Sequence, residues 1–275
     1  MENSIINNKY KIIHKIDSGN FGYIYKGENI RTRENVAIKV EPIVNNTKLL
    51  KNESIIYLNI GNYIGIPTVK WYGKDDTNYY MVINLLGDSL ENIKQLNGKI
   101  NLKATLQIGI NILSILKHIH SYGYVHRDIK PENLLFGLNK QNIYIIDFGL
   151  CKKYMINDNH IEMNTKKNLI GTPNYASINS HNFFELSRRD DLESLSYILL
   201  YIFFGTLPWI DKYNYLSESE RNICIRNDKK DIFLNEHIPL VLLNFYKNVI
   251  NLSFKETPNY EYYINLFTNE IIQLT

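Results

Sequence analysis

The sequence His-Arg-Asp-Ile-Lys-Pro-Glu-Asn at residues 126–133, followed by Ile-Ile-Asp-Phe-Gly at residues 145–149, decides the fold that the chain is expected to adopt. The first segment carries a carboxylate, an amine and an amide, and the second adds another carboxylate after a short apolar hairpin. This combination suits phosphoryl transfer, in which catalysis consists mostly of positioning an alcohol and neutralising charge on the transferring group.

Four side chains of these segments would have distinct tasks in such a reaction. Asp128 would accept the hydrogen of the incoming hydroxyl and orient it for in-line attack. Lys130 would hold the γ-phosphate of the donor. Asn133 and Asp147 would supply the oxygen ligands that a hard cation such as Mg²⁺ prefers. The expected metal cofactor is therefore Mg²⁺.

The two segments match the catalytic-loop and Asp-Phe-Gly motifs of eukaryotic-type protein kinases, which the chain resembles. A lone Asp-Phe-Gly could be an ordinary polar loop, but a fully matched catalytic loop at the expected distance argues strongly against that. The Asp-x-Lys-x-x-Asn spacing at residues 128–133 is similar to the serine/threonine rather than the tyrosine branch.

Composition indicates a globular chain with a large core. Of its 275 residues, 44% are hydrophobic and 21% are charged, and the net charge of +3 does not predict nucleic-acid binding. Two cysteines fit a reducing compartment, residues 1–9 do not form a signal peptide, and the apolar run at residues 197–204 is too short to cross a membrane. We expect a soluble, intracellular monomer, cytoplasmic or nuclear, in the host cell if the gene is viral, with no nucleic-acid or membrane partner.

β-Strands are expected at residues 10–16, 23–29 and 36–40 from their alternation and β-branched content. By resemblance, the turn between the first two strands covers the nucleotide phosphates with Gly19 and Gly22, and Lys39 pairs the α- and β-phosphates. Asp17 stands where the family has glycine, and we expect its side chain to point to solvent.

A helix is expected at residues 47–58, with Leu50, Ser54, Tyr57 and Leu58 on neighbouring faces. The order of the motifs, rather than periodicity, makes Glu53 the candidate partner of Lys39, an ion pair that an active kinase requires.

The strand at residues 79–86 would lead into the hinge, where resemblance implies that backbone groups of Asn84 and Leu86 bind adenine and Ile83 is the gatekeeper. Five further residues would enclose the ring, although each could simply belong to the core: Ile16, Ile24, Ala37, Leu135 and Ile146.

The C-terminal part is expected to be mostly helical. Residues 102–122 have an apolar stripe, residues 195–204 are apolar on every side and should be buried, and helices are also expected at residues 238–254 and 260–274. The predicted fold is therefore α+β, a single two-lobed kinase catalytic domain over residues 1–275. Its N-lobe (about 1–86) would hold a small antiparallel sheet and one helix, and its C-lobe (about 87–275) would be mostly helical.

Three segments resemble the casein kinase I family more narrowly. They are Leu-Leu-Gly-x-Ser-Leu-Glu at 85–91, Gly-Thr-x-x-Tyr-Ala-Ser-Ile-Asn at 171–179 and Ser-Arg-Arg-Asp-Asp-Leu-Glu-Ser-Leu at 187–195. The chain is identified as a divergent, compact member of this family. The resemblance implies activity without activation-loop phosphorylation, a role for Asp191 in holding the catalytic loop, and a catalytic set of Lys39, Glu53, Asp128, Lys130, Asn133, Asp147 and Thr172.

The family also prefers acidic or already phosphorylated substrates, and here the chain departs from its pattern. Asn174 stands where the family's phosphate site has an arginine, and an ungapped alignment places Glu220 where it has a lysine. Acids in place of cations reverse the local attraction, so we predict weak preference for phosphorylated substrates. Four lysines of the activation segment could still attract acidic sequence, or could form a solvated basic face: Lys152, Lys153, Lys166 and Lys167.

The leading hypothesis is a Mg²⁺- and ATP-dependent kinase that phosphorylates serine or threonine in proteins. A pseudokinase scaffold with weak nucleotide binding is the alternative from another class, and it normally lacks one of Lys39, Asp128 or Asp147, all of which are present. A basic nucleic-acid binder is a third possibility that the mild charge disfavours.

Overall fold

The computed structural model describes residues 1–19, 22–43, 49–234 and 236–274. The chain divides into two compact units, of which the first combines Met1–Gly87 with Phe136–Gly149 and the second combines Asp88–Leu135 with Leu150–Thr275. The segment that carries the Asp-Phe-Gly sequence therefore belongs to the same unit as the N-terminal strands, although it follows the catalytic loop in the chain.

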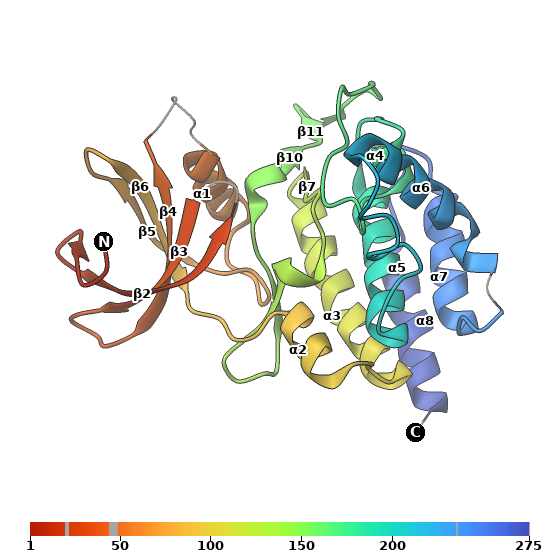
Figure 1. The fold of residues 1–275 in the computed structure, drawn as a ribbon, viewed down its shortest axis with the longest axis horizontal. Coiled ribbons are helices and arrows are strands. Elements are labelled where there is room, and N and C mark those ends of the chain that lie inside the picture. Colours follow the sequence, from red (N-terminus) through yellow and green to blue (C-terminus); the bar gives the residue numbers. More distant parts are fainter. Residues whose placement is uncertain (20–21, 44–48, 235, 275) are drawn as a thin grey trace. The chain divides into compact units, whose positions relative to one another are not determined.

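The first unit is built on a six-stranded sheet in the order β1-β2-β3-β4-β6-β5, and neighbouring strands are antiparallel (Figure 1). Tyr10, Ile12, Ile38, Val40 and Val82 are among the buried residues of its main apolar cluster. The elements are β1 (Ile5–Ile6), β2 (Tyr10–Gly19), β3 (Gly22–Asn29), β4 (Asn35–Pro42), α1 (Leu49–Ile60), β5 (Val69–Lys74), β6 (Asn78–Asn84) and β9 (Ile143–Ile145).

Glycine is required where β3 begins. Gly22 has φ +150°, and a Cβ placed on it would lie 2.0 Å from the carbonyl oxygen of Val40 on β4. The two strands can approach this closely only without a side chain at that position. Asn20 and Phe21 of the expected glycine turn lie outside the described residues.

Helix α1 presents Glu53 on its buried stripe. Leu50, Glu53, Ser54 and Tyr57 are buried at helical spacing, whereas Leu58, on a neighbouring face of the helix, is 67% exposed. The carboxylate of Glu41 on β4 accepts a hydrogen bond from the Leu50 backbone N–H at 2.7 Å. An anion at this end satisfies a free N–H and complements the helix dipole. Thr47, where the helix was expected to begin, lies outside the described residues.

The second unit is mainly helical, and α3 packs against α5 and α8 while α5 also packs against α7 (Figure 1). Its helices are α2 (Leu90–Asn97), α3 (Leu102–Ser121), α4 (Ile178–His181), α5 (Arg188–Phe204), α6 (Glu218–Asp231), α7 (Leu240–Ile250) and α8 (Tyr260–Gln273). Its short strands are β7 (Tyr124–Val125), β10 (Lys152–Lys153), β11 (Met155–Ile156) and β12 (Asn159–His160), and β8 (Leu134–Phe136) lies at the boundary of the units.

Helix α5 is the centre of the helical unit, as its apolar sequence predicts. Every residue from Leu192 to Ile202 is buried, whereas Phe203 and Phe204, which were also expected to be buried, are half-buried. At the start of the helix the Asp190 carboxylate accepts a hydrogen bond from the Ser187 N–H at 2.7 Å. The predicted α+β architecture, with an antiparallel sheet first and helices after it, is confirmed. Within the described ranges, no helix is at once long and apolar enough to cross a lipid bilayer.

Candidate active site

An ion-pair centre lies in the first unit. The Nζ of Lys39, in the middle of β4, lies 2.7 Å from Oε2 of Glu53 on α1 and 2.9 Å from Oδ1 of Asp147. Burial lowers the pKa of Lys39, but the charges of Glu53 and Asp147 outweigh it and hold that pKa above its ordinary value. Lys39 therefore stays positive beside two carboxylates, as an amine that pairs phosphates must.

The Asp-Phe-Gly segment is fastened to α1. Phe148 is fully buried, with its ring 4.7 Å from that of Tyr57 in an edge-to-face arrangement, and the Tyr57 hydroxyl accepts a hydrogen bond from the Asp147 N–H at 3.3 Å. Asp147 has φ +66°, which is rare for a residue with a side chain. The hydrogen bond to Tyr57 and the ion pair with Lys39 hold Asp147 in this unusual backbone conformation.

A second cluster lies in the catalytic loop of the second unit. Oδ2 of Asp128 lies 2.8 Å from Nζ of Lys130, while Oδ1 accepts hydrogen bonds from the backbone N–H of Thr172 at 2.9 Å and from its hydroxyl at 2.8 Å. Lys130 also donates to the Thr172 hydroxyl at 3.1 Å. The structure thus brings Asp128, Lys130 and Thr172 together around one carboxylate, which is only 9% exposed.

Asn133 belongs to the same cluster and has a side chain suited to a metal ion. Its amide nitrogen donates to the backbone oxygen of Asp128 at 2.9 Å, so the amide oxygen is the atom available to a cation. Amide and carboxylate oxygens are ligands that Mg²⁺ accepts. When bound, the ion would neutralise charge on the phosphates, with Asn133 and Asp147 holding it. The predicted pairing of these two residues on one ion remains a prediction because they belong to different units.

Asp191 holds the backbone of the catalytic loop. It lies at the start of α5, and its carboxylate accepts hydrogen bonds from the N–H of His126 at 2.7 Å and of Arg127 at 2.8 Å and contacts the His120 ring at 2.8 Å. Arg127 has φ +69°, so these bonds hold it in a conformation that side chains rarely adopt. This arrangement agrees with the role that the sequence implies for Asp191.

The comparison with known families bears on the chain as a whole. A family model described as protein kinase domain matches residues 10–263. The chain belongs to the protein kinase family. It is therefore a kinase, a phosphotransferase whose family uses ATP with a divalent metal and acts on protein substrates. The predicted two-lobed kinase fold is confirmed.

The residues predicted to bind adenine have different surroundings in the kinase. Ala37 is buried and Ile16 is 48% exposed, whereas the following are half-buried: Ile24, Ile83, Leu86, Leu135 and Ile146. Leu135 belongs to the second unit and the others to the first, so their enclosing one ring stays a prediction, as does the role of Gly19 and Gly22 over the phosphates. Asp17 is exposed and accepts a hydrogen bond from the Ser18 N–H, an arrangement compatible with the expected solvent-facing position.

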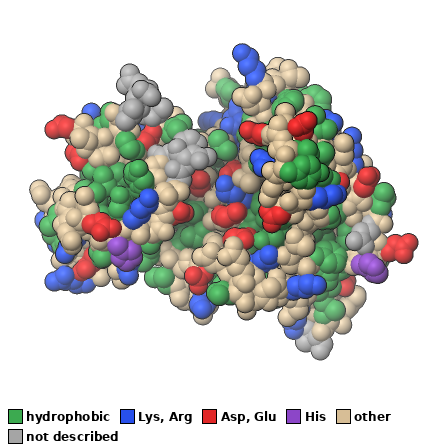
Figure 2. Space-filling model, in the orientation of Figure 1, with side chains coloured by type: hydrophobic (Ala, Val, Ile, Leu, Met, Phe, Trp, Pro, Cys, Tyr) green, Lys and Arg blue, Asp and Glu red, His purple; other side chains and the backbone are tan. Residues whose placement is uncertain are grey.

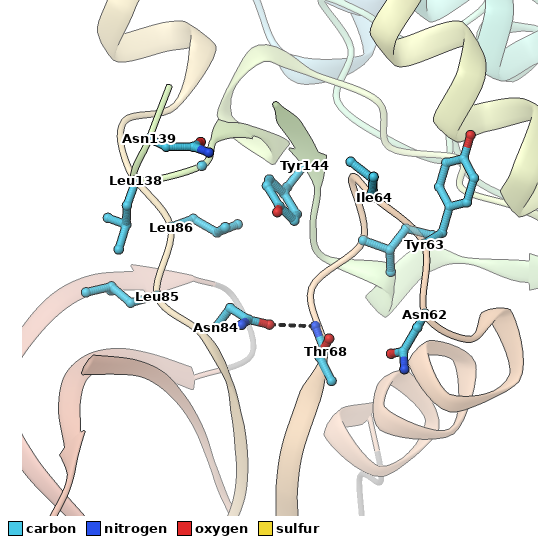
Figure 3. A pocket seen from close by; sticks show the side chains of 12 residues that line it. Asn62, Tyr63, Ile64, Thr68, Asn84, Leu85, Leu86, Leu138, Asn139 and Tyr144 are labelled. Carbon is cyan, nitrogen blue, oxygen red and sulfur yellow. Dashed lines mark hydrogen bonds between the residues drawn. The ribbon is translucent and has the colours of Figure 1, made fainter. Parts of the chain in front are cut away.

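A cavity of about 560 Å³ lies beside the predicted hinge, within the first unit (Figure 3). Asn84 and Leu86 line it, and Oδ1 of Asn84 accepts a hydrogen bond from the Thr68 N–H at 2.8 Å. The side chain of Asn84 is thus committed to Thr68, which is compatible with the predicted use of its backbone for adenine. The lining residues include no lysine or arginine, so this cavity is unsuited to the phosphates.

Two charged residues that pattern reasoning did not select prove to be buried near the site. Glu185 is 1% exposed, and Lys229 on α6 has no exposed surface. Lys229 stands among polar neighbours in the sequence, which indicate a solvated surface and give no sign of burial. Glu185 stands between Phe184 and Leu186, and this apolar setting is the one local signal that could have pointed to its burial. Burial of a charge depends on partners that are distant in the chain.

Proposed function

We propose that the chain is a Mg²⁺- and ATP-dependent serine/threonine protein kinase of the casein kinase I type. The observation that carries this proposal is the buried carboxylate of Asp128, held between Lys130 and Thr172. A carboxylate fixed in this way can accept the hydrogen of a serine or threonine hydroxyl while Lys130 holds the transferring phosphate. Lys39 would hold the other phosphates, and Asn133 and Asp147 would hold the metal.

Catalytic competence, rather than a scaffold role, is supported by the ion pair in the first unit. Lys39 and Glu53 are joined at 2.7 Å, a contact that kinases require for activity. Lys39, Asp128 and Asp147 are all present, whereas a pseudokinase normally lacks one of them. Nucleic-acid binding has no comparable support, because positive and negative side chains are interspersed on the face of the helical unit drawn in Figure 2.

Phosphorylation of casein tests the proposal. Purified kinase, radiolabelled ATP and Mg²⁺ are expected to label casein on serine and threonine, as shown by phosphoamino-acid analysis. Chelation of the metal should abolish labelling, and the protein with Asp128→Asn is the matched negative control. Labelling only on tyrosine, or equal labelling by the variant, would contradict the proposal.

Substrate preference follows from the charges around the activation segment. Lys152 and Lys166 are already paired with Glu185, whereas Lys153 and Lys167 are exposed. We therefore propose that these two exposed lysines attract acidic sequence in protein substrates, and that the attraction is weak and salt-dependent.

A phosphoserine three residues before the target is expected to raise kcat/KM by less than about fivefold, because exposed single charges contribute no more than about 1 kcal/mol. Glu220, which the ungapped alignment places at the family's lysine, is exposed, and its carboxylate accepts hydrogen bonds from Ser217 in a capping box. Steady-state kinetics on matched peptides with serine or phosphoserine at that position measure the effect. A gain of about tenfold or more, about 1.4 kcal/mol, would show that other cations recognise the phosphate.

A further inference from the structure

Three cations of the helical unit converge on the carboxylate of Glu185. The Nζ of Lys152 lies 2.7 Å from Oε2, the Nζ of Lys166 contacts the same oxygen, and Arg127 Nη1 lies 3.8 Å from Oε1. We call these four residues the Glu185 cluster. Glu185 is 1% exposed, whereas the three cations keep between 15% and 34% of their side-chain surface.

The buried carboxylate is held as an anion. Desolvation raises the pKa of Glu185, but hydrogen bonds and charges from Lys152 and Lys166 outweigh it, and the pKa lies below its ordinary value. Without the carboxylate, three positive groups would face one another in a partly desolvated space, where like charges repel strongly. The cluster therefore needs an anion at its centre.

The cluster joins three segments that contribute to phosphoryl transfer. Arg127 directly precedes Asp128, and its Nε donates to the Leu150 carbonyl at 2.7 Å. Lys152 belongs to β10, which pairs with β7 just before the catalytic loop. Lys166 lies in the activation segment, six residues before Thr172 in the sequence. One carboxylate thus links Arg127 of the catalytic loop to Lys152 and Lys166, both of which lie in the chain between Asp128 and Thr172.

Other kinases achieve such a tie with a phosphate, which orders the activation loop by pairing with arginine. We propose that Glu185 is a permanent substitute for that phosphate, a positioning residue that keeps Arg127 and the activation segment in the catalytic arrangement. This proposal rests on the proposed kinase function. It assigns to Glu185 the independence from activation-loop phosphorylation that the resemblance to the casein kinase I family implies.

The proposal predicts that a small anion can replace the side chain. In Glu185→Ala the three cations remain around a vacated space that sulfate can enter, so sulfate should raise the melting temperature of this variant more than that of the wild type. Sulfate stabilises many proteins by exclusion from their surface, which is why the difference between variants is the quantity measured. Glu162→Ala is the matched control, since Glu162 is exposed and pairs only with Lys255 among the described residues.

Activity is measured on the same proteins with casein and Mg²⁺-ATP. We expect kcat of Glu185→Ala to fall by about 10- to 100-fold, because a displacement of about 1 Å in a catalytic group can reduce the rate about 100-fold. Sulfate should restore much of it, relative to chloride at equal ionic strength. Glu185→Gln keeps the size without the charge and leaves no space for sulfate, so it should lose activity without rescue, whereas Glu185→Asp should retain most of it.

The outcomes separate the two proposals. An inactive wild type would contradict the proposed function, and the sulfate-dependent melting of Glu185→Ala would still test the cluster. An active wild type with an equally active Glu185→Ala would overturn the role of Glu185. If Glu185→Ala lost activity and sulfate changed neither its melting temperature nor its kcat, the Glu185 side chain would be merely structural. That result would also overturn the proposed role of Glu185.

Discussion

Asp128→Asn is expected to lower kcat for phosphoryl transfer by about 10²- to 10⁴-fold, the range that a positioned general base contributes. The amide has nearly the same shape but cannot take the hydrogen of a hydroxyl. Its NH₂ group at the position of Oδ2 would also face the Lys130 ammonium, which lies 2.8 Å from Oδ2 in the wild type. Both groups are hydrogen-bond donors, so this contact would be lost. Phosphate positioning by Lys130 would suffer together with orientation of the alcohol.

Single-turnover and steady-state kinetics on casein measure this effect, with the KM for ATP and the melting temperature recorded on the same samples. Both should change little, because the loop is also held by Asp191 through the N–H groups of His126 and Arg127. Asp158→Asn is the matched control, since Asp158 is exposed in the turn between β11 and β12. Retention of more than about a tenth of the wild-type kcat would remove Asp128 from the role of general base.

The cluster of Asp128, Lys130 and Asn133 could be predicted from the sequence because these residues lie in one contiguous motif whose spacing reflects a local loop. Lys39 and Glu53 are 14 residues apart, and only the order of motifs connected them. The structure supplies the physical reason: Glu53 lies on the buried stripe of α1, and Glu41 fixes the start of that helix from the same strand that carries Lys39. Periodicity also predicted α3, which buries the face that its apolar residues mark, whereas α5 was predicted from an apolar run on every side.

Buried charges could not be predicted in this way. Lys152 and Lys166 look like part of a solvated basic face in the sequence, yet both pair with Glu185, a residue 33 positions away from Lys152. No local pattern encodes such a pair because the favourable term arises only when the folded chain brings the charges together. The two-residue strands β10, β11 and β12 escape prediction for a related reason, as alternation over two residues carries no signal.

Lys229 is the clearest case of a residue that only the structure identifies. Its Nζ donates to the carbonyl oxygens of Pro173 and Ala176 in the activation segment and lies 4.7 Å from the centre of the Tyr197 ring. Burial lowers its pKa well below the ordinary value, and burial likewise raises the pKa of Glu193 on α5 to about 7. The amine is thus a hydrogen-bond donor sealed inside the helical unit, beneath the segment that follows Thr172.

Lys229→Met is expected to reduce the free energy of unfolding by about 1–3 kcal/mol, because the buried Ala176 carbonyl loses its donor and an unsatisfied buried group costs about that much, whereas the Pro173 carbonyl still faces Nε2 of His181 at 3.1 Å. Methionine has a similar length and can contact the Tyr197 and Trp209 rings that now surround the amine, so the loss should come from polar satisfaction rather than from a cavity. Urea unfolding followed by circular dichroism measures it, with Lys230→Met as the control, since Lys230 is the exposed neighbour on the same helix.

Because the Pro173 and Ala176 carbonyls that lose the lysine flank Asn174 and Tyr175, the KM for a protein substrate should rise in folded Lys229→Met while the KM for ATP changes little. Equal unfolding free energies for the two variants would mean that ordered water satisfies Pro173 and Ala176 as well as the lysine does.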